Sequence, residues 1–233
     1  MIKWTEILST NNVALMQAGE DFNIHPLALE DCINREQRPK FEDFDHHQLL
    51  VWFIYTQNQI FELQFLLFKD HIIVVPHDNP PSGNSWADYL KLDMNQKDVW
   101  HLIFQALDKS TDITWNEIKK IFEQINLFEE KMFTENFNPQ SLLHIKKKFN
   151  QMEFSLAHLA SVAEQLQSYY QVKDDLTWKL RDLHDHSQRI YQSITLHSSQ
   201  IATTIELYWG HHAHRTNIHI KKLSLLASIG LPL

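Results

Sequence analysis

A helical pattern without a stop signal runs through the C-terminal part of the sequence. An apolar stripe at helical spacing follows it, formed by Ile190, Ile194, Ile201, Ile205 and Tyr208. Gly210 weakens the pattern, but no proline interrupts it before Pro232. At about 1.5 Å per residue, residues 176–230 would form a rod of roughly 80 Å. A helix of that length needs neighbouring helices, so the rest of the fold has to be arranged along it.

Two segments ahead of this rod repeat apolar residues in alternating steps of three and four. The first contains Ile118, Ile121, Ile125, Phe128 and Met132, and the second contains Leu142, Ile145, Phe149, Met152, Leu156, Leu159, Ala163 and Leu166. This spacing predicts two long helices that pack along a narrow seam. The break between them, residues 136–140, is short enough to make the two helices antiparallel.

The first part of the chain, up to about residue 97, has a different character. Residues 49–56, 60–68 and 71–76 are rich in β-branched and aromatic residues, which predicts an antiparallel meander. Residues 10–18 and 26–34 have helical spacing. We therefore predict an α+β fold: a small antiparallel or mixed sheet flanked by helices in an α/β sandwich over 1–97, then a part over 98–233 made of long antiparallel helices.

Composition excludes several classes of function. Lys and Arg number 21 against 29 Asp and Glu, a net charge of −8, which would repel nucleic acid. Four glycines are too few for a glycine-rich phosphate loop, and no nucleophile and base stand at usable spacing, so we do not expect an enzyme. The single cysteine, Cys32, excludes an intrachain disulfide and favours a reducing, cytosolic setting.

The C-terminal residues allow two interpretations. Residues 223–233 carry no charge and directly follow Lys221 and Lys222. These eleven residues are fewer than the roughly 20 that cross a bilayer. They can be a hydrophobic tuck against the core, or the start of a transmembrane helix with a basic cytoplasmic flank.

The stretch HPLALEDCINREQRPKFEDF at residues 25–44 resembles the signature of the cytoplasmic domain of CorA magnesium transporters. Similarity continues through Leu127-Phe128-Glu129-Glu130, Leu180-Arg181-Asp182 and Thr216-Asn217, and covers essentially the whole chain. Two departures stand out: the family's first strands are missing ahead of Trp4, and its Gly-Met-Asn tripeptide would lie beyond Leu233. We therefore expect that this stretch alone cannot transport.

The resemblance implies a pentameric channel for divalent cations, with two transmembrane helices per subunit, in the cell inner membrane. This chain would face the cytoplasm, with a stalk helix over about 176–222 that enters the first transmembrane helix at 223–233. Cations bound between neighbouring cytoplasmic domains would hold the closed state. Mg²⁺ is the expected regulatory and transported ion, and Co²⁺, Ni²⁺ or Zn²⁺ are alternatives.

The resemblance also implies the metal-binding residues Glu30, Asp31, Asp108 and Asp182. Mg²⁺ prefers oxygen ligands and keeps several waters, so spread carboxylates suffice to hold it. Each acid taken alone is more typical of a solvated surface carboxylate, and it is the joint match of all four to the family that favours metal binding.

The stalk positions that would line the pore entrance are Glu206, Thr216, Asn217, Ile220 and Leu223. Thr216, Ile220 and Leu223 step by four and three and so share one face. Rings of Ile220 and Leu223 would form a hydrophobic constriction, while Asn217 and Glu206 would offer oxygens to a hydrated cation. A plain coiled-coil seam is the alternative, and with it a structural interaction protein.

Histidine is abundant, with fifteen in the chain. His184 and His186 lie on the predicted stalk, and His211, His212, His214 and His219 lie near its membrane end. Imidazole suits Zn²⁺, Co²⁺ or Ni²⁺ better than Mg²⁺. Surface or lining histidines are the more ordinary interpretation, but the run keeps open a zinc-transporting relative within the same superfamily.

Overall fold

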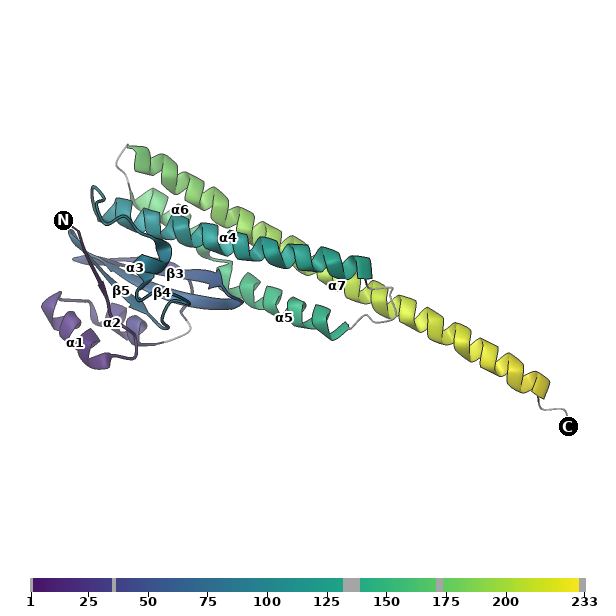
Figure 1. The fold of residues 1–233 in the computed structure, drawn as a ribbon. Helices are drawn as coiled ribbons and strands as arrows, with labels where there is room; N and C mark the ends of the chain where they lie inside the picture. The colour runs from purple at the N-terminus through teal and green to yellow at the C-terminus, as the bar shows by residue number, and fades with distance from the viewer. Residues whose placement is uncertain (1, 35–36, 132–138, 171–173, 231–233) are drawn as a thin grey trace.

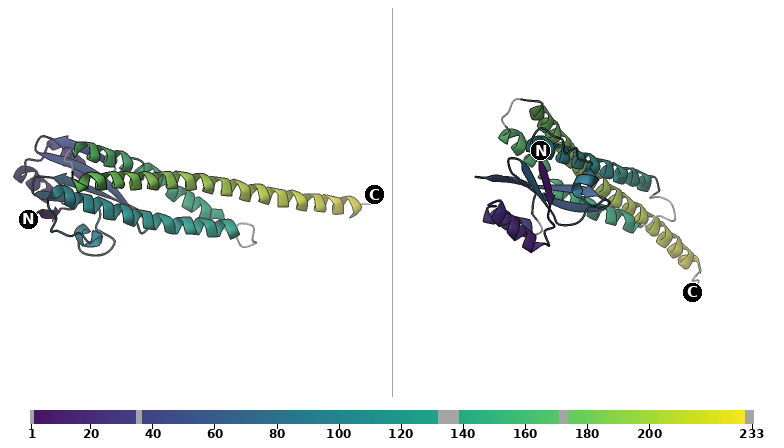
Figure 2. Two further views of the ribbon diagram at one scale, coloured as in Figure 1. Left: turned by 90° about the horizontal axis from the view of Figure 1, so that it is seen from above. Right: turned by 60° about the vertical axis from the view of Figure 1, so that its left-hand side comes forward.

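A computed structural model describes residues 2–34, 37–131, 139–170 and 174–230. A sheet near the N-terminus is covered on one face by two short helices, and long helices lie over its other face (Figure 1). The last helix continues far past all other elements toward the C-terminus, as the turned views also show (Figure 2). The predicted fold class is confirmed, because the described residues form a five-stranded mixed sheet followed by long helices.

The sheet has the strand order β1-β5-β4-β3-β2. The three predicted strands are confirmed as β3 (His47–Thr56), β4 (Gln59–Leu67) and β5 (His71–Pro76), paired antiparallel. Two edge strands were not predicted: β1 (Lys3–Glu6), which runs parallel to β5, and β2 (Lys40–Phe44), antiparallel to β3. Both are short and polar, as edge strands often are, so neither carries a clear alternating pattern.

Helices on the two faces of the sheet are docked by side chains of neighbouring strands. On one face, Gln64 of β4 donates to the backbone oxygen of Asp31 in α2 (Pro26–Ile33) at 3.0 Å. On the other, the Trp52 indole of β3 donates to Ser110 of α4 (Val99–Lys131) at 2.9 Å. Trp52 pairs with Leu63, the neighbour of Gln64, so the two docking side chains point to opposite faces. Helix α1 (Asn12–Asp21) lies beside α2 (Figure 1).

The helical part differs from the prediction in one respect. The single helix predicted over 142–166 is divided into α5 (Pro139–Leu156) and α6 (Leu159–Tyr169) by a turn at residues 157–158. Leu156, Leu159 and Ala163 on both sides of the turn are buried, so the apolar seam continues across it. The apolar spacing therefore predicted the buried seam, but it did not predict the turn that divides the helix into α5 and α6. A short helix, α3 (Trp86–Leu90), was also not predicted.

The predicted order along the chain otherwise holds. Helix α5 runs back against the direction of α4 and α7 (Figure 1), as expected for an antiparallel pair. Of the predicted break between them at 136–140, residues 136–138 lie outside the described residues, as does Met132 of the predicted seam. Among the described residues no strand follows residue 100.

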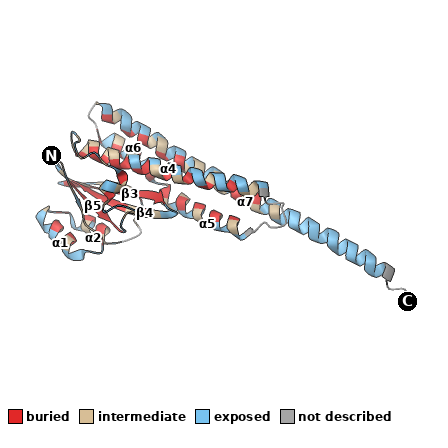
Figure 3. Ribbon diagram, in the orientation of Figure 1, coloured by how far each residue is buried: buried red, intermediate tan, exposed pale blue. Residues whose placement is uncertain are grey.

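Helix α7 (Asp175–Gly230) is a single helix of 56 residues, as the missing stop signal predicted. Its buried side chains end at Thr204, and every described side chain from Trp209 to Ser228 is exposed (Figure 3). Over the described parts of the chain, no helix combines the length and the apolar character that a membrane crossing needs. The division of the chain near residue 97 and the continuation into a membrane at 223–233 stay predictions.

Candidate metal centre

Helix α4 carries two aspartates on the side that faces α7. Ser110 and Thr114 dock α4 onto β3, through the Trp52 indole and the Tyr55 backbone N–H. Asp108 lies two residues before Ser110, about 200° around the helix, so it points away from the sheet and toward α7. Asp112 follows one helical turn after Asp108, on the same side.

Helix α7 brings Asp182 and His186 to these two acids. The Nε2 atom of His186 lies 3.7 Å from an oxygen of Asp182, at i and i+4 on one face. Burial raises the pKa of Asp108, and the charges of Asp112 and Asp182 raise it further, while His186 acts in the opposite direction. The three carboxylates therefore repel one another, so a bound proton or cation is favoured at this position.

This cluster consists of Asp108, Asp112, Asp182 and His186. Asp112 was not named from the sequence, and His186 was named there only as a stalk histidine and not as a partner of the acids. Asp112 and His186 each stand four residues after a predicted acid, which is the spacing that places side chains on one helical face. That spacing was the available signal. A small cavity of about 40 Å³ lies beside the cluster, lined by Thr111, Asp112, Trp115, His186, Arg189 and Ile190.

The other two predicted metal residues, Glu30 and Asp31, lie in the last turns of α2. The helix begins at the His-Pro pair: His25 accepts a hydrogen bond from the Leu27 N–H, and Pro26 is the first helical residue. An acid near a helix C-terminus is unfavourable to the helix dipole. Lys40 offsets this, because its Nζ lies 2.6 Å from a carboxylate oxygen of Asp31.

Within one chain, the four predicted acids therefore form two separate groups. Asp108 and Asp182 lie near each other between α4 and α7, whereas Glu30 and Asp31 lie on α2 across the sheet (Figure 1). Glu30 is exposed, and Asp31 already has Lys40 as a counterion. Their assignment as ligands stays a prediction, since joining the two groups needs a neighbouring copy of the chain. Cys32, next to Asp31, is buried, and burial raises its pKa to about 12.

The predicted pore positions all lie on the exposed end of α7. Thr204 is the last buried residue among the described side chains of α7. Glu129 of α4 accepts hydrogen bonds from Gln200 at 3.0 Å and from Thr204 at 2.7 Å. Beyond that point lie Glu206, Thr216, Asn217, Ile220 and Leu223, all exposed. Ile220 keeps 54% and Leu223 66% of its surface exposed, although both are apolar. His211, His212, His214 and His219 are exposed on the same segment.

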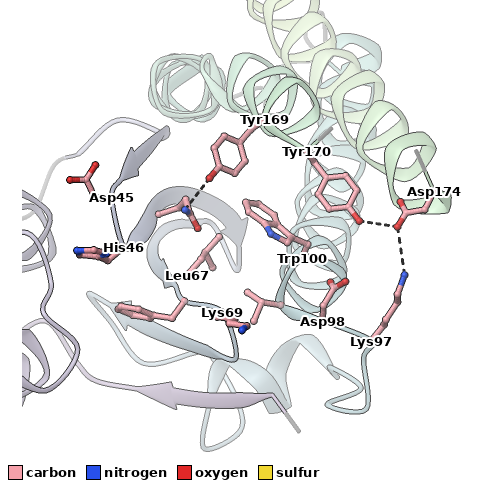
Figure 4. Close-up of a pocket in the computed structure, with 13 residues that line it drawn as sticks. Asp45, His46, Leu67, Lys69, Lys97, Asp98, Trp100, Tyr169, Tyr170 and Asp174 are labelled. Carbon is pink, nitrogen blue, oxygen red and sulfur yellow. Dashed lines mark hydrogen bonds and ion pairs between the residues drawn. The ribbon is translucent and has the colours of Figure 1, made fainter. Parts of the chain in front are cut away.

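A further group of ionisable side chains, which the sequence analysis did not single out, lies where α4 and α7 begin. His101 of α4 faces Asp174 and Asp175 at the start of α7. Asp174 also lines an open cavity of about 620 Å³ (Figure 4). His101 is at least 73 residues from the two aspartates in the chain, so no local sequence motif indicates this group.

Comparison with known proteins gives consistent results. The sequence matches the family of CorA-like Mg²⁺ transporter proteins over residues 1–233. It is 24% identical to the cobalt/magnesium transport protein CorA of Thermotoga maritima, over 99% of this chain and 70% of that protein. The complete structure of the CorA magnesium transporter from Methanocaldococcus jannaschii has a similar fold, with a TM-score of 0.82, 12% identity, and coverage of 97% of this chain and 75% of that chain. The cytoplasmic domain of ZntB from Vibrio parahaemolyticus also resembles it, with a TM-score of 0.71, 14% identity, and coverage of 93% and 89%.

Proposed function

The chain belongs to the family of CorA-like Mg²⁺ transporter proteins, and from this premise we propose that it is the cation-sensing part of a pentameric divalent-cation channel. In this proposal residues 1–222 face the cytoplasm at the inner membrane. The stalk helix α7 then leads from residue 223 into the first membrane-spanning helix. Within the family, the chain is part of a transporter and not of an enzyme.

The observation that carries the proposal is the uncovered distal half of α7. Apolar side chains there are exposed at helical spacing, including Leu207, Ile220, Leu223 and Leu226. A single soluble chain rarely leaves so many large apolar side chains on one extended segment. Copies of the same helix packed side by side around an axis would cover these side chains, and a membrane would cover the last of them.

The cluster at α4 and α7 supports Mg²⁺ as the regulatory ion. Asp108, Asp112 and Asp182 offer oxygen ligands, partly open to water, which suits a hard cation that retains its own waters. Acids on the α2 helix of a neighbouring copy, Glu30 and Asp31, would complete the site. His186 adds an imidazole, which would let Co²⁺ or Ni²⁺ compete at the same position.

In this proposal, the pore opens because carboxylates of neighbouring copies repel one another when no cation is bound. With cations bound, carboxylates of neighbouring copies are bridged; without them, they repel one another in a chain whose net charge is already −8. Repulsion would push neighbouring copies apart at the base of the stalk. Asp182 and Leu223 are 41 residues apart, roughly 60 Å on one helix, so a small tilt at the base would move the constriction at the tip.

Zinc transport is the second candidate, because one observation favours it. His211, His212, His214 and His219 are exposed on the distal stalk, where copies of the helix would bring several imidazoles close together. Imidazole nitrogen is a ligand that Zn²⁺ accepts and Mg²⁺ avoids. Flux of radioactive Zn²⁺ compared with Mg²⁺ through the protein in liposomes distinguishes the two.

The test of the sensing role uses the protein with its membrane-spanning region in liposomes. Asp182→Lys places a fixed positive charge where the cation would bind, so the pore should stay closed even at low internal Mg²⁺. Asp185→Lys is the matched control, because Asp185 is exposed on the same helix, outside the cluster. If flux through Asp182→Lys responded to internal Mg²⁺ as the unmodified protein does, the cluster would not be the sensor.

A further inference from the structure

The N-terminal ends of α4 and α7 meet at the end of the molecule opposite the distal stalk (Figure 1). His101 lies in the first turn of α4, and Asp174 and Asp175 lie at the start of α7. One nitrogen of His101 and one oxygen from each aspartate all lie within 4.8 Å of one another. This group, called the junction cluster below, combines an imidazole with two carboxylates from distant parts of the chain.

The His101 ring is held in one orientation by a carboxylate behind it. Its Nδ1 lies 2.8 Å from Asp98 Oδ1, while its Nε2 lies 3.6 Å from Asp175 Oδ1. With the proton on Nδ1 donated to Asp98, the lone pair of Nε2 points toward the two aspartates. Histidines that bind metals are held in this way, with the second ring nitrogen donating to a carboxylate that fixes the tautomer.

Burial distinguishes the junction cluster from a chance meeting of surface acids. The His101 side chain keeps only 10% of its surface exposed, so its ring cannot turn freely into solvent. Asp98 also accepts a hydrogen bond from the His101 backbone N–H at 3.0 Å, so its carboxylate is itself held in place behind the ring.

The cations that now neutralise the two aspartates are exposed and movable. Lys179 lies 2.7 Å from Asp175 and keeps 47% of its side chain exposed; Lys97 lies 3.8 Å from Asp174 and keeps 70% exposed. The Tyr170 hydroxyl donates to Asp174 at 2.9 Å, which orients that carboxylate (Figure 4). Both lysines can swing into water, and the cavity beside Asp98 and Asp174 leaves room for water ligands.

We propose that His101, Asp174 and Asp175 bind one divalent transition-metal ion of the Zn²⁺, Co²⁺ or Ni²⁺ class within a single chain, with Asp98 holding the imidazole. One nitrogen and two carboxylate oxygens are the ligands of open zinc-type sites, whereas Mg²⁺ is bound by oxygen and avoids imidazole. His101 is seven residues, roughly 10 Å along α4, from Asp108. The bound ion would tie the start of α7 to α4, and the proposal does not depend on the cation-sensing role of the Asp108 cluster.

Zinc binding by the chain, measured by titration calorimetry, tests this. The unmodified chain should bind one Zn²⁺ at least tenfold more tightly than Mg²⁺. His101→Gln and Asp175→Asn should weaken that event by tenfold or more. Asp98→Asn, which removes no ligand, should weaken it by roughly 10- to 100-fold. Lys179→Gln, which removes a competing cation, should tighten it.

Two controls test whether the tight binding event belongs to the junction cluster and whether the variants still fold. The double variant His211→Gln, His214→Gln removes the distal imidazoles and should leave the tight event unchanged. Asp175 keeps 64% of its side chain exposed, so Asp175→Asn should fold normally, which melting without metal verifies. If His101→Gln and Asp175→Asn bound Zn²⁺ like the unmodified chain, or if Mg²⁺ bound as tightly as Zn²⁺, the junction cluster would be a plain ion-pair network and the proposal would be wrong.

Discussion

The proximal and distal halves of α7 carry the same kind of apolar side chain in opposite surroundings. In the proximal half, where α7 packs against α4, α5 and α6, the side chains of Leu183, Ile194 and Ile201 are fully buried. In the distal half, Ile220 and Leu223 are more than half exposed on the same continuous helix. Helical spacing therefore predicts that a segment is helical and leaves open what covers it. In the part of the chain that the structure describes, every side chain from Trp209 to Ser228 is exposed.

The largest expected difference between the halves is in core truncation. Ile194→Ala should lower the free energy of unfolding of the isolated chain by about 2 to 5 kcal/mol, because it opens a cavity under neighbouring helices. Leu223→Ala should change it by less than about 0.5 kcal/mol, because the side chain is already in water. Urea unfolding followed by circular dichroism measures both. Equal losses would mean that the distal half is covered even in the isolated chain.

Mg²⁺ should stabilise the proximal half only when copies of the chain assemble around it. Ions that bind only the assembled state raise its apparent stability by mass action, by about 2.7 kcal/mol at a hundredfold excess over Kd. Asp182→Asn should remove most of that gain, and Asp185→Asn should keep it. Thermal melts with and without Mg²⁺, on material shown to be pentameric, make the comparison. Coincident melts for the unmodified chain would contradict the sensing role.

A smaller effect concerns how the free energy of unfolding depends on pH, to which a buried histidine should contribute more than the exposed histidines of the distal half. His47 of β3 is buried between Phe44 and Phe68, and in the described part of the chain neither of its ring nitrogens has a hydrogen-bond partner. Burial lowers its pKa below the ordinary value of 6.5, with His25 and His46 lowering it further and Asp43 opposing them. The unfolded chain therefore binds more protons just below that pH.

Stability should accordingly fall as the pH drops below about 6.5, by an amount on the order of 1 kcal/mol. His71, whose pKa burial also lowers, acts in the same direction. His47→Phe, which keeps the aromatic stack, should reduce the loss, whereas His211→Gln on the exposed stalk should not. Urea midpoints at several pH values measure it. An unchanged pH profile in His47→Phe would assign the loss to other groups.

The smallest effect concerns Gly210, where an added methyl group would meet nothing within 4 Å. Gly210→Ala should stabilise the helix locally by about 0.5 to 1 kcal/mol, because alanine loses less backbone entropy than glycine when the helix forms. Because Gly210 and the described side chains that follow it are exposed, the free energy of global unfolding should stay unchanged. Amide hydrogen exchange near residue 210 should slow, while the urea midpoint stays constant. A shift of the midpoint would show that both halves unfold as one unit.

The sequence predicts helices and strands well where the apolar periodicity is strong. It predicts them less well at the edges of the sheet and at turns that leave the periodicity unchanged. β3, β4, β5 and the unbroken α7 follow directly from their patterns. β1 and β2 are short, polar edge strands, so they show no apolar periodicity that could predict them. The turn at 157–158 does not interrupt the apolar spacing, so the spacing could not reveal it.

The residues of the candidate sites also differ in how far the sequence could predict them. Asp108 and Asp182 are indeed brought close together, but no spacing in the sequence relates α4 to α7. Asp112 and His186 could have been found from their i, i+4 positions. His101, Asp98, Asp174 and Asp175 meet only because two helix starts are adjacent in space, and no pattern within either segment encodes that.

The most direct test of the account measures distances between copies of the stalk. A spin label at Leu223, exposed in the single chain, reports the separation of distal halves in the protein with its membrane-spanning region. In millimolar Mg²⁺ the account predicts a narrow distribution of short distances, which lengthens and broadens when Mg²⁺ is removed. In Asp182→Lys the short distances should persist without Mg²⁺. Absence of any distance between copies, or a distribution that ignores Mg²⁺ in the unmodified protein, would contradict it.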